Sequence, residues 1–395
     1  MIKTLKSFDF KNKNVLLRVD FNVPIESGHI VDNFRIKSSL PTIKYLLDAG
    51  ASIILMSHLG RPNGKKVENL SLQPIGEELA GMLEMPIKFS HSCVSEDSLD
   101  TSLGLKSGEI HLLENLRFYS EEEKNDFTFS SRLAKHGSVY INDAFGTLHR
   151  SHASNEGIVN HFKHRGIGKL VEKEIEYLDK MLKKPDQPLS LIIGGSKVKT
   201  KLEMIEKFLK ISDNILIGGG MCFTFIKARG KNIGKSILES NSLDIARDII
   251  NKARANSVNI VLPTDFLCGK SIEDHLADGP YYTRDFPNNL MGLDIGPDSI
   301  SRFKNILSKS NTIVWNGPLG AFEFEPFENG TKEIAKYLGS RCNLGSKVVI
   351  GGGDTASAIK KFNLISEMSH VSTGGGASLK IMSGDKLPGL ISLES

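Results

Sequence analysis

The sequence contains few cysteines and has no long apolar run. Its four cysteines lie far apart and none forms a Cys-x-x-Cys pair: Cys93, Cys222, Cys268 and Cys342. This spacing argues against a structural zinc site and a disulfide framework, and it is typical of a reducing compartment such as the cytoplasm. The most apolar stretches have only the length of a strand, so we expect neither a membrane-spanning segment nor a signal peptide.

Several catalytic patterns are missing too. The sequence contains no G-x-x-x-x-G-K-[ST], which argues against a P-loop enzyme. It also has no evident Ser-His-Asp or Cys-His arrangement and no histidine spacing typical of metal ligands. The absence of a general base is expected if the acceptor is a carboxylate, because that group is already ionised at neutral pH. The net charge of +4, with cations and anions interspersed, favours small anionic ligands over nucleic acid.

What the sequence does contain is a regular alternation of short apolar runs and longer amphipathic segments. This pattern predicts an α/β fold with parallel sheets flanked by helices, and 395 residues suggest two domains. A helix is expected over 201–210. The strands expected in the first half are 15–20, 52–57, 109–113 and 139–142. Those expected in the second half are 189–193, 214–217, 259–262, 312–315, 347–350 and 370–372.

The join between the two domains is predicted near residues 169–187. A charged helix with one apolar face is expected over 169–184, and the segment Lys-Lys-Pro-Asp-Gln-Pro then ends it. We therefore expect an N-terminal domain over 1–168, a helix and linker over 169–187, a C-terminal domain over 188–376, and a final segment over 377–395. The helix is either a hinge or one more surface helix, and periodicity alone does not decide between them.

Four strands of the second half run into glycine clusters, which no strand of the first half does. Glycine lets a backbone approach a phosphate closely, and a following helix directs its free amides at the negative charge. Lys197 and Lys201, four residues apart at an expected helix start, would share a face and clamp a phosphate. The alternative is that both are solvated surface lysines.

Two acids of the second half have a structural and a functional interpretation each. Asp354 follows a Gly-Gly-Gly turn and is either a helix N-cap or the carboxylate that holds the magnesium of a nucleotide. Glu323, shortly after the single tryptophan, either reaches a ribose hydroxyl or faces solvent. The stretch around Asp354 also fits G-x-G-x-x-A, a weak dinucleotide fingerprint that leaves a dehydrogenase open.

The first half places basic residues after its strands instead of glycines. Arg18, Asp20 and Asn22 alternate along one expected strand and would point to one side. His58 with Arg61, then Arg117, then Arg150 follow the next strands, while Arg35 starts a helix. One arginine is usually a surface group or a salt-bridge partner. Arginines recurring beyond successive strand ends predict a site for a carboxylate and a phosphate together.

Taken together, these residues resemble the phosphoglycerate kinase family over almost the whole chain. The resemblance rests on long motifs in a fixed order: RVDFNVP, HLGRP, ENLRF, NDAFGTLHRSHAS, GGSKVKTKL, GGGMCFTF, WNGPLGAFE, GGGDTASAI and STGGGASL. Mild departures occur at Leu148, Cys222 and Lys380, and none removes a charged contact.

The resemblance implies reversible transfer of a phosphoryl group between ATP and 3-phosphoglycerate in glycolysis, with Mg²⁺, by a cytoplasmic monomer. It implies two Rossmann-like domains joined by a hinge helix, domain closure before direct in-line transfer, and a C-terminal segment that returns to the first domain. The residues implied for 3-phosphoglycerate are Asp20, Phe21, Asn22, Arg35, His58, Arg61, Arg117 and Arg150. Those implied for the nucleotide are Lys197, Lys201, Gly292, Asn316, Glu323, Gly352, Gly353, Asp354 and Thr355, with Asp354 serving the metal.

For catalysis itself, the resemblance implies that Arg35 and Lys201 neutralise the transferring group, aided by backbone N–H groups of Gly374 and Gly375. Two other interpretations compete with this one: a nucleotide-dependent dehydrogenase, and a catalytically silent binding protein on the same fold. A silent version would have lost Arg35, Lys201 or Asp354, and all three are present.

Overall fold

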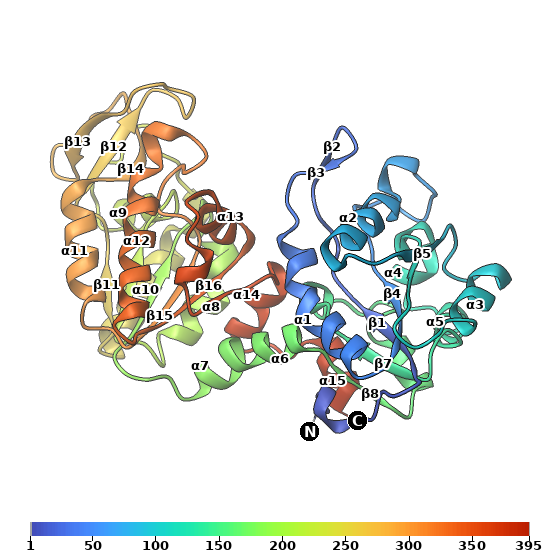
Figure 1. Cartoon of the computed structure of the whole chain (residues 1–395). Coiled ribbons are helices and arrows are strands. Elements are labelled where there is room, and N and C mark those ends of the chain that lie inside the picture. Colours follow the sequence, from blue (N-terminus) through green and yellow to red (C-terminus); the bar gives the residue numbers. More distant parts are fainter. Residues whose placement is uncertain (1, 395) are drawn as a thin grey trace. The chain divides into compact units, whose positions relative to one another are not determined.

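A computed structural model describes residues 2–394 and divides the chain into two compact units. Unit 1 runs up to Glu176 and includes a second segment that begins at Lys386, whereas unit 2 runs from Tyr177 to Asp385. The red C-terminal helix α15 (Pro388–Glu394) accordingly lies among the blue and green elements of unit 1 in Figure 1. Unit 2 is therefore inserted between two segments of unit 1.

Unit 1 is built on a six-stranded parallel sheet with the strand order β5-β6-β4-β1-β7-β8. Its strands are β1 (Asn14–Arg18), β4 (Ser52–Met56), β5 (Ile87–Ser90), β6 (Ile110–Leu113), β7 (Val139–Asn142) and β8 (Arg165–Ile167). The central strand β4 is buried along its whole length, as expected of a parallel strand covered by helices on both faces. The flanking helices are α1 (Phe34–Asp48), α2 (Gln73–Leu83), α3 (Glu96–Leu103), α4 (Ser120–Glu123), α5 (Phe127–Ala134) and α6 (Lys169–Ile175).

The sequence analysis found four of these six strands and missed the two at the sheet edges. Strand β5 is partly exposed and β8 has only three residues, so neither gives a continuous apolar run. A short hairpin of β2 (Ile25–Glu26) and β3 (His29–Ile30) was missed for the same reason. Strand β1 also ends at Arg18 rather than at residue 20, so Asp20 and Asn22 lie in the loop that follows and not on the strand.

Unit 2 contains a second six-stranded parallel sheet, with the order β11-β10-β9-β15-β16-β17. Counted along the chain this is the order 3-2-1-4-5-6 of Rossmann folds. In unit 1 the order is 3-4-2-1-5-6, because its fourth strand lies between the second and the third. All six strands were predicted to within one residue at each end: β9 (Leu189–Ile193), β10 (Asn214–Ile217), β11 (Asn259–Val261), β15 (Thr312–Asn316), β16 (Lys347–Gly351) and β17 (His370–Val371). Its main helices are α8 (Leu202–Phe208), α9 (Cys222–Ala228), α10 (Leu243–Ala255), α11 (Pro297–Leu307), α12 (Asn329–Asn343), α13 (Gly353–Lys361) and α14 (Gly376–Ser383).

Unit 2 also has a three-stranded antiparallel sheet, which the sequence analysis did not predict. Its order is β13-β12-β14, from β12 (Asp265–Gly269), β13 (Asp278–Tyr282) and β14 (Met291–Ile295). Strand β13 is mostly exposed and contains a Gly-Pro pair, so its sequence has the composition of a loop.

The expected helix over 169–184 is present, but its interior is not α-helical throughout. It consists of α6, a π-helical segment over Glu176–Lys180, and α7 (Met181–Lys183). The division between the units falls at the start of the π-helical segment. Among residues 2–394, no helix combines the length and the apolar character that crossing a bilayer requires.

Candidate active site

In unit 1 the predicted basic residues gather at the carboxyl edge of the parallel sheet. The loop after β1 carries Asp20 and Asn22, the loop after β4 carries His58 and Arg61, the loop after β6 carries Arg117, and the loop after β7 carries Arg150. Since all strands are parallel, these loops emerge at one edge, where ligands of such sheets bind.

Two sets of hydrogen bonds hold these loops together. The guanidinium of Arg35, near the start of α1, contacts the Asp20 carboxylate at 3.1 Å and donates to the carbonyl oxygen of Asn22 at 3.1 Å. The side-chain oxygen of Asn22 accepts from the N–H of Gly60 at 2.9 Å, and Arg117 donates to the Gly60 carbonyl at 2.7 Å. Residues from three different loops are thereby fixed relative to one another.

His58 lies at the centre of the cationic group. Its pKa lies well below the ordinary histidine value, first because the ring is buried and then because of four nearby cations: Arg18, Arg117, Arg35 and Arg150. A neutral imidazole surrounded by guanidinium groups is suited to an anion that carries several charges. We call Arg18, Arg35, His58, Arg117 and Arg150 the arginine cluster.

The predicted residues of unit 1 differ in how deeply they are buried. Phe21 is buried, and its N–H donates to the Ser57 hydroxyl at 2.9 Å. Arg150 is half-buried, and its Nε donates to Nε2 of His149 at 3.3 Å. Arg61 is exposed. Burial lowers the pKa of Arg117 to about 10, which leaves the group cationic at neutral pH.

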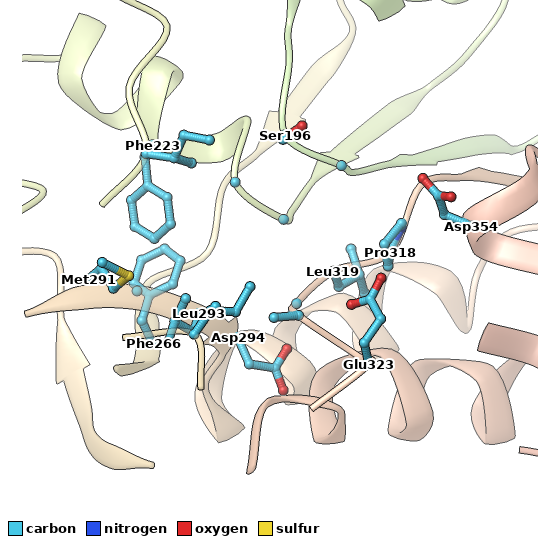
Figure 2. A pocket seen from close by; sticks show the side chains of 18 residues that line it. Ser196, Phe223, Phe266, Met291, Leu293, Asp294, Pro318, Leu319, Glu323 and Asp354 are labelled. Atoms are coloured by element: carbon cyan, nitrogen blue, oxygen red, sulfur yellow. The ribbon is translucent and has the colours of Figure 1, made fainter. Parts of the chain in front are cut away.

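Unit 2 contains a pocket of about 360 Å³ at the carboxyl ends of β9, β10 and β15 (Figure 2). These strands flank the point where the strand order reverses, which is where dinucleotide folds bind their ligand. The lining residues come from many parts of unit 2: Gly195 and Ser196, Gly219 and Gly220, Phe223, Ile237, Phe266, Ile272, Met291 to Asp294, Pro318 to Ala321, Glu323, and Asp354.

One end of the pocket is apolar. The rings of Phe223 and Phe266 have centroids 4.7 Å apart, and both lie beside Met291 and Leu293 in Figure 2. Gly292 is required here because a Cβ atom on it would lie 2.2 Å from Cζ of Phe223. The opposite end has glycine backbone and the carboxylates of Glu323 and Asp354.

Close backbone contact explains the glycine turn after β10. Gly219 has a φ of +60°, and a Cβ atom there would lie 2.7 Å from the backbone nitrogen of Gly195. The turns after β9 and β10 therefore pack directly against each other, and only glycine satisfies both the conformation and the contact.

Lys201, Asn316 and Asp354 form a charged group next to this pocket. The Lys201 ammonium donates to the side-chain oxygen of Asn316. Burial lowers the pKa of Lys201, while the negative charge of Asp354 opposes that shift. Nδ2 of Asn316 is buried without a hydrogen-bond partner and lies 3.1 Å from the position that a Cβ atom on Gly352 would take. A buried amide donor left unpaired indicates a missing acceptor.

Several local predictions in unit 2 were wrong. Lys197 is exposed and precedes a short 3-10 turn, while α8 begins only at Leu202, so Lys197 and Lys201 do not share a helical face. The expected helix over 201–210 is shorter, because it ends at Phe208. Asp354 is not an N-cap, since α13 begins at Gly353 and no side chain caps it.

The other predicted residues of unit 2 link or flank the turns. Thr355 accepts a hydrogen bond from the N–H of Gly317 at 2.6 Å and so ties the turn after β16 to the turn after β15. Gly353 is exposed at the start of α13. Gly375, with a φ of +47°, precedes α14, and the N–H of Gly374 donates to the Ser372 hydroxyl at 3.0 Å.

A sequence model of one protein family, described as phosphoglycerate kinase, matches residues 5–385 of this chain. The chain belongs to the phosphoglycerate kinase family. Its activity is that of a phosphoglycerate kinase, EC 2.7.2.3, a glycolytic phosphotransferase that uses ATP. The resemblance seen in the sequence motifs is therefore confirmed, and the dehydrogenase interpretation is wrong.

Relatives and solved structures agree with this assignment along the full chain. The phosphoglycerate kinase of Finegoldia magna is 48% identical over 392 residues, covering 98% of each chain, and that of Gloeothece citriformis is 44% identical over 394 residues, covering 100% of this chain and 98% of its own. The structure of phosphoglycerate kinase from Coxiella burnetii matches with a TM-score of 0.90 at 34% identity, covering 100% of this chain and 99% of that one. That likeness confirms the predicted fold class.

The candidate site also contains residues that sequence reasoning did not select. Arg18 was seen as part of a motif but not chosen for the site, although it contacts His58. Phe223 lies inside the GGGMCFTF motif, so the glycines that precede it could have indicated its place at the nucleotide pocket. Phe266 belongs to the unpredicted antiparallel sheet and carries no local signal at all.

Proposed function

We propose that unit 1 binds 3-phosphoglycerate through the arginine cluster, together with Asp20, Phe21, Asn22 and Arg61. The placement of Arg117, Arg150 and His58 on loops at one edge of the parallel sheet supports this most directly, together with the contact between Arg18 and His58. The ligand carries a carboxylate and a phosphate, and planar guanidinium groups pair with both kinds of anion in bidentate fashion. Asp20 and the Asn22 carbonyl hold Arg35 and thereby orient one of these groups.

We propose in addition that the pocket of unit 2 binds the nucleotide. The base would lie between the apolar side chains near Gly292, and the Glu323 carboxylate would accept from a ribose hydroxyl. The phosphates would follow the glycine turns toward Lys197, Lys201, Asn316 and the Gly352–Thr355 segment. The unpaired Nδ2 of Asn316 supports the phosphate end of this assignment, since a phosphate oxygen would supply its missing acceptor.

Asp354 is the residue proposed to hold the Mg²⁺ that accompanies the nucleotide. Its carboxylate is exposed, belongs to the first turn of α13 and lines the pocket. Among residues 2–394, no group of three or more His, Cys, Asp or Glu side chains converges on a point. One carboxylate nevertheless fits, because Mg²⁺ keeps several waters and takes its other ligands from phosphates. The ion would neutralise charge on those phosphates.

Transfer is proposed to be direct and in line, from the nucleotide to the carboxylate of 3-phosphoglycerate and back. The carboxylate is ionised at neutral pH and attacks without a base. Catalysis then consists of positioning and charge neutralisation, for which Arg35, Lys201 and the backbone N–H groups of Gly374 and Gly375 are the proposed groups. Direct transfer also requires contact between the ligands and exclusion of water, so we propose domain closure about the helix over 169–184.

Three measurements test these proposals. Calorimetric titration should show Mg²⁺-dependent ADP binding in the wild type and much weaker Mg²⁺ dependence in Asp354→Asn, with unchanged 3-phosphoglycerate binding.

Small-angle scattering should give a smaller radius of gyration with both ligands than with either one, and an unchanged radius would argue against closure. Light scattering should give 43.4 kDa if the enzyme is a monomer. We further propose that it acts in the cytoplasm, where ATP and glycolytic metabolites occur together.

A further inference from the structure

A buried carboxylate with no role in the proposed ligand contacts lies behind the arginine cluster. Glu122, on α4, is fully buried, and both its oxygens are hydrogen-bonded to Ser154. Oε2 accepts from the Ser154 N–H at 2.9 Å, and Oε1 accepts from the Ser154 hydroxyl at 2.6 Å. His152 lies 3.7 Å from Oε1. A buried carboxylate is costly unless it is paired, so its retention here calls for a reason.

Ser154 links the Glu122 carboxylate to Arg18 through hydrogen bonds. Since the single hydroxyl hydrogen of Ser154 is donated to Glu122, its oxygen can only accept from the other side. It accepts from Nε of Arg18 at 2.9 Å. Tyr140 fixes the serine further by donating to its carbonyl oxygen at 2.8 Å. The direction of each hydrogen bond from Arg18 to Glu122 is therefore determined.

A second nitrogen of the Arg18 guanidinium determines the protonation state and tautomer of His58. NH2 of Arg18 lies 3.3 Å from Nδ1 of His58, and a guanidinium can only donate. Nδ1 must therefore accept, which leaves the ring neutral with its single hydrogen on Nε2. The Asp20 carboxylate lies 3.9 Å from Nδ1, which is beyond hydrogen-bond distance.

We propose that Glu122 and Ser154 are positioning residues that act through Arg18 to keep His58 as a neutral Nε2–H donor for an oxygen of the substrate. This inference rests on the proposed binding of 3-phosphoglycerate at the arginine cluster. It assigns His58 a donor role rather than acid–base chemistry. It also gives the buried carboxylate a function, because Glu122 and Asp20 are the carboxylates whose charge balances the buried Arg18.

Nitrogen NMR of histidine-labelled protein tests the tautomer directly. In the wild type at neutral pH, His58 should show Nε2 protonated and Nδ1 bare, and a protonated Nδ1 would overturn the proposal. In Glu122→Gln and in Ser154→Ala, the His58 signals should move toward a mixture of tautomers. Ser154→Ala keeps both charges in place, so it remains informative if Glu122→Gln does not fold. The matched control is Glu121→Gln, because Glu121 is exposed on the same helix.

Kinetics separate positioning from a purely structural role. Both variants should raise the KM for 3-phosphoglycerate about tenfold or more, as expected when a hydrogen bond to a charged group is lost, and leave the KM for ATP unchanged. A parallel rise in both constants, or unchanged His58 signals, would contradict the proposal. Failure of the proposed binding site would look different: Arg117→Ala, a change in the arginine cluster itself, would then leave the KM for 3-phosphoglycerate unchanged, whatever the tautomer of His58.

Discussion

The ammonium group of Lys201 and the side-chain oxygen of Asn316 are joined by a hydrogen bond at the carboxyl end of β15. This contact orients the amide so that its Nδ2 faces the turn at Gly352. Lys201 therefore has two roles in the proposed site: it supplies positive charge, and it directs a second donor toward the phosphates. Burial lowers the pKa of Lys201 because it removes water from the ammonium group. The hydrogen bond to Asn316 replaces part of that lost hydration.

Replacing Lys201 by alanine should reduce kcat by at least about 100-fold, the usual loss when one preorganised group that stabilises transition-state charge is removed. A coupled assay with 3-phosphoglycerate and Mg-ATP measures this. Lys199→Ala is the matched control, because Lys199 is exposed two residues away in the same turn. Comparable losses in the two variants would show that general charge matters there rather than the contact with Asn316.

Replacing Arg35 by alanine should lower kcat far more than it changes nucleotide affinity. Arg35 belongs to unit 1 and contacts Asp20 and Asn22, and it does not line the nucleotide pocket. Turnover and ADP titration measure the two effects separately. Lys37→Ala, on the exposed side of the same helix, should leave both unchanged. If kcat and ADP affinity fell equally, Arg35 would be a binding or folding residue only.

A methyl group at Gly292 should selectively weaken nucleotide binding. The new Cβ would lie 2.2 Å from Cζ of Phe223, so this ring, which lines the pocket, must shift. We expect the KM for ATP to rise about tenfold or more while the KM for 3-phosphoglycerate stays constant. Gly81→Ala is the control, because nothing lies within 4 Å of its Cβ position. Unchanged nucleotide affinity in Gly292→Ala would show that the base does not bind between these side chains.

A second set of buried histidines, in unit 1, has a fixed hydrogen-bond direction. Nε2 of His136 faces the carbonyl of Cys93, which only accepts, so in the neutral ring Nδ1 accepts from the Ser102 hydroxyl. Ser102 then accepts from Nδ1 of His111, whose Nε2 accepts from Ser90. With both rings neutral, this assignment gives every group in the chain a hydrogen-bond partner. Burial, the leading cause, lowers the pKa of each to about 4.

Acidification should therefore destabilise the protein through His111 and His136. The unfolded rings, with a pKa near 6.5, bind protons that the folded rings exclude, so stability falls as the pH drops from about 6.5 toward 4. These two rings together should contribute up to about 2.7 kcal/mol per pH unit to the slope of the unfolding free energy, in addition to the contribution of buried His58. Urea unfolding at several pH values measures it, and His136→Gln should remove about half of this contribution. His164→Gln, at an exposed position, should retain all of it.

The sequence predicted the buried parts of the fold better than its edges. Strands such as β4 and β9 are buried along their whole length, and the resulting apolar runs are visible in the sequence. The missed strands β5 and β8 are partly exposed or very short, and β13 is mostly exposed, so none of the three gives a continuous apolar run. Their pairing is decided by neighbours far away in the chain, which local patterns do not record.

The same distinction applies to the candidate site. Arg35, His58 and Asp354 lie in local motifs at element ends, where the type of residue already suggests chemistry. Glu122 and Phe266 become relevant only through contacts with Ser154 and Phe223, which are distant in the sequence. Asp354 also shows that local signals can be ambiguous, because the capping alternative was settled only by where α13 begins.

The return of the chain to unit 1 has a consequence for how the protein is made. Leu387 and Leu393 are buried in unit 1, and the N–H of Gly389 donates to the carbonyl of Leu148 at 3.0 Å. These contacts join residues separated by more than 200 positions, because all of unit 2 intervenes. During synthesis, unit 1 therefore stays incompletely packed until the ribosome has also made unit 2 and α15. Until then, the apolar surface that α15 later covers is accessible to chaperones.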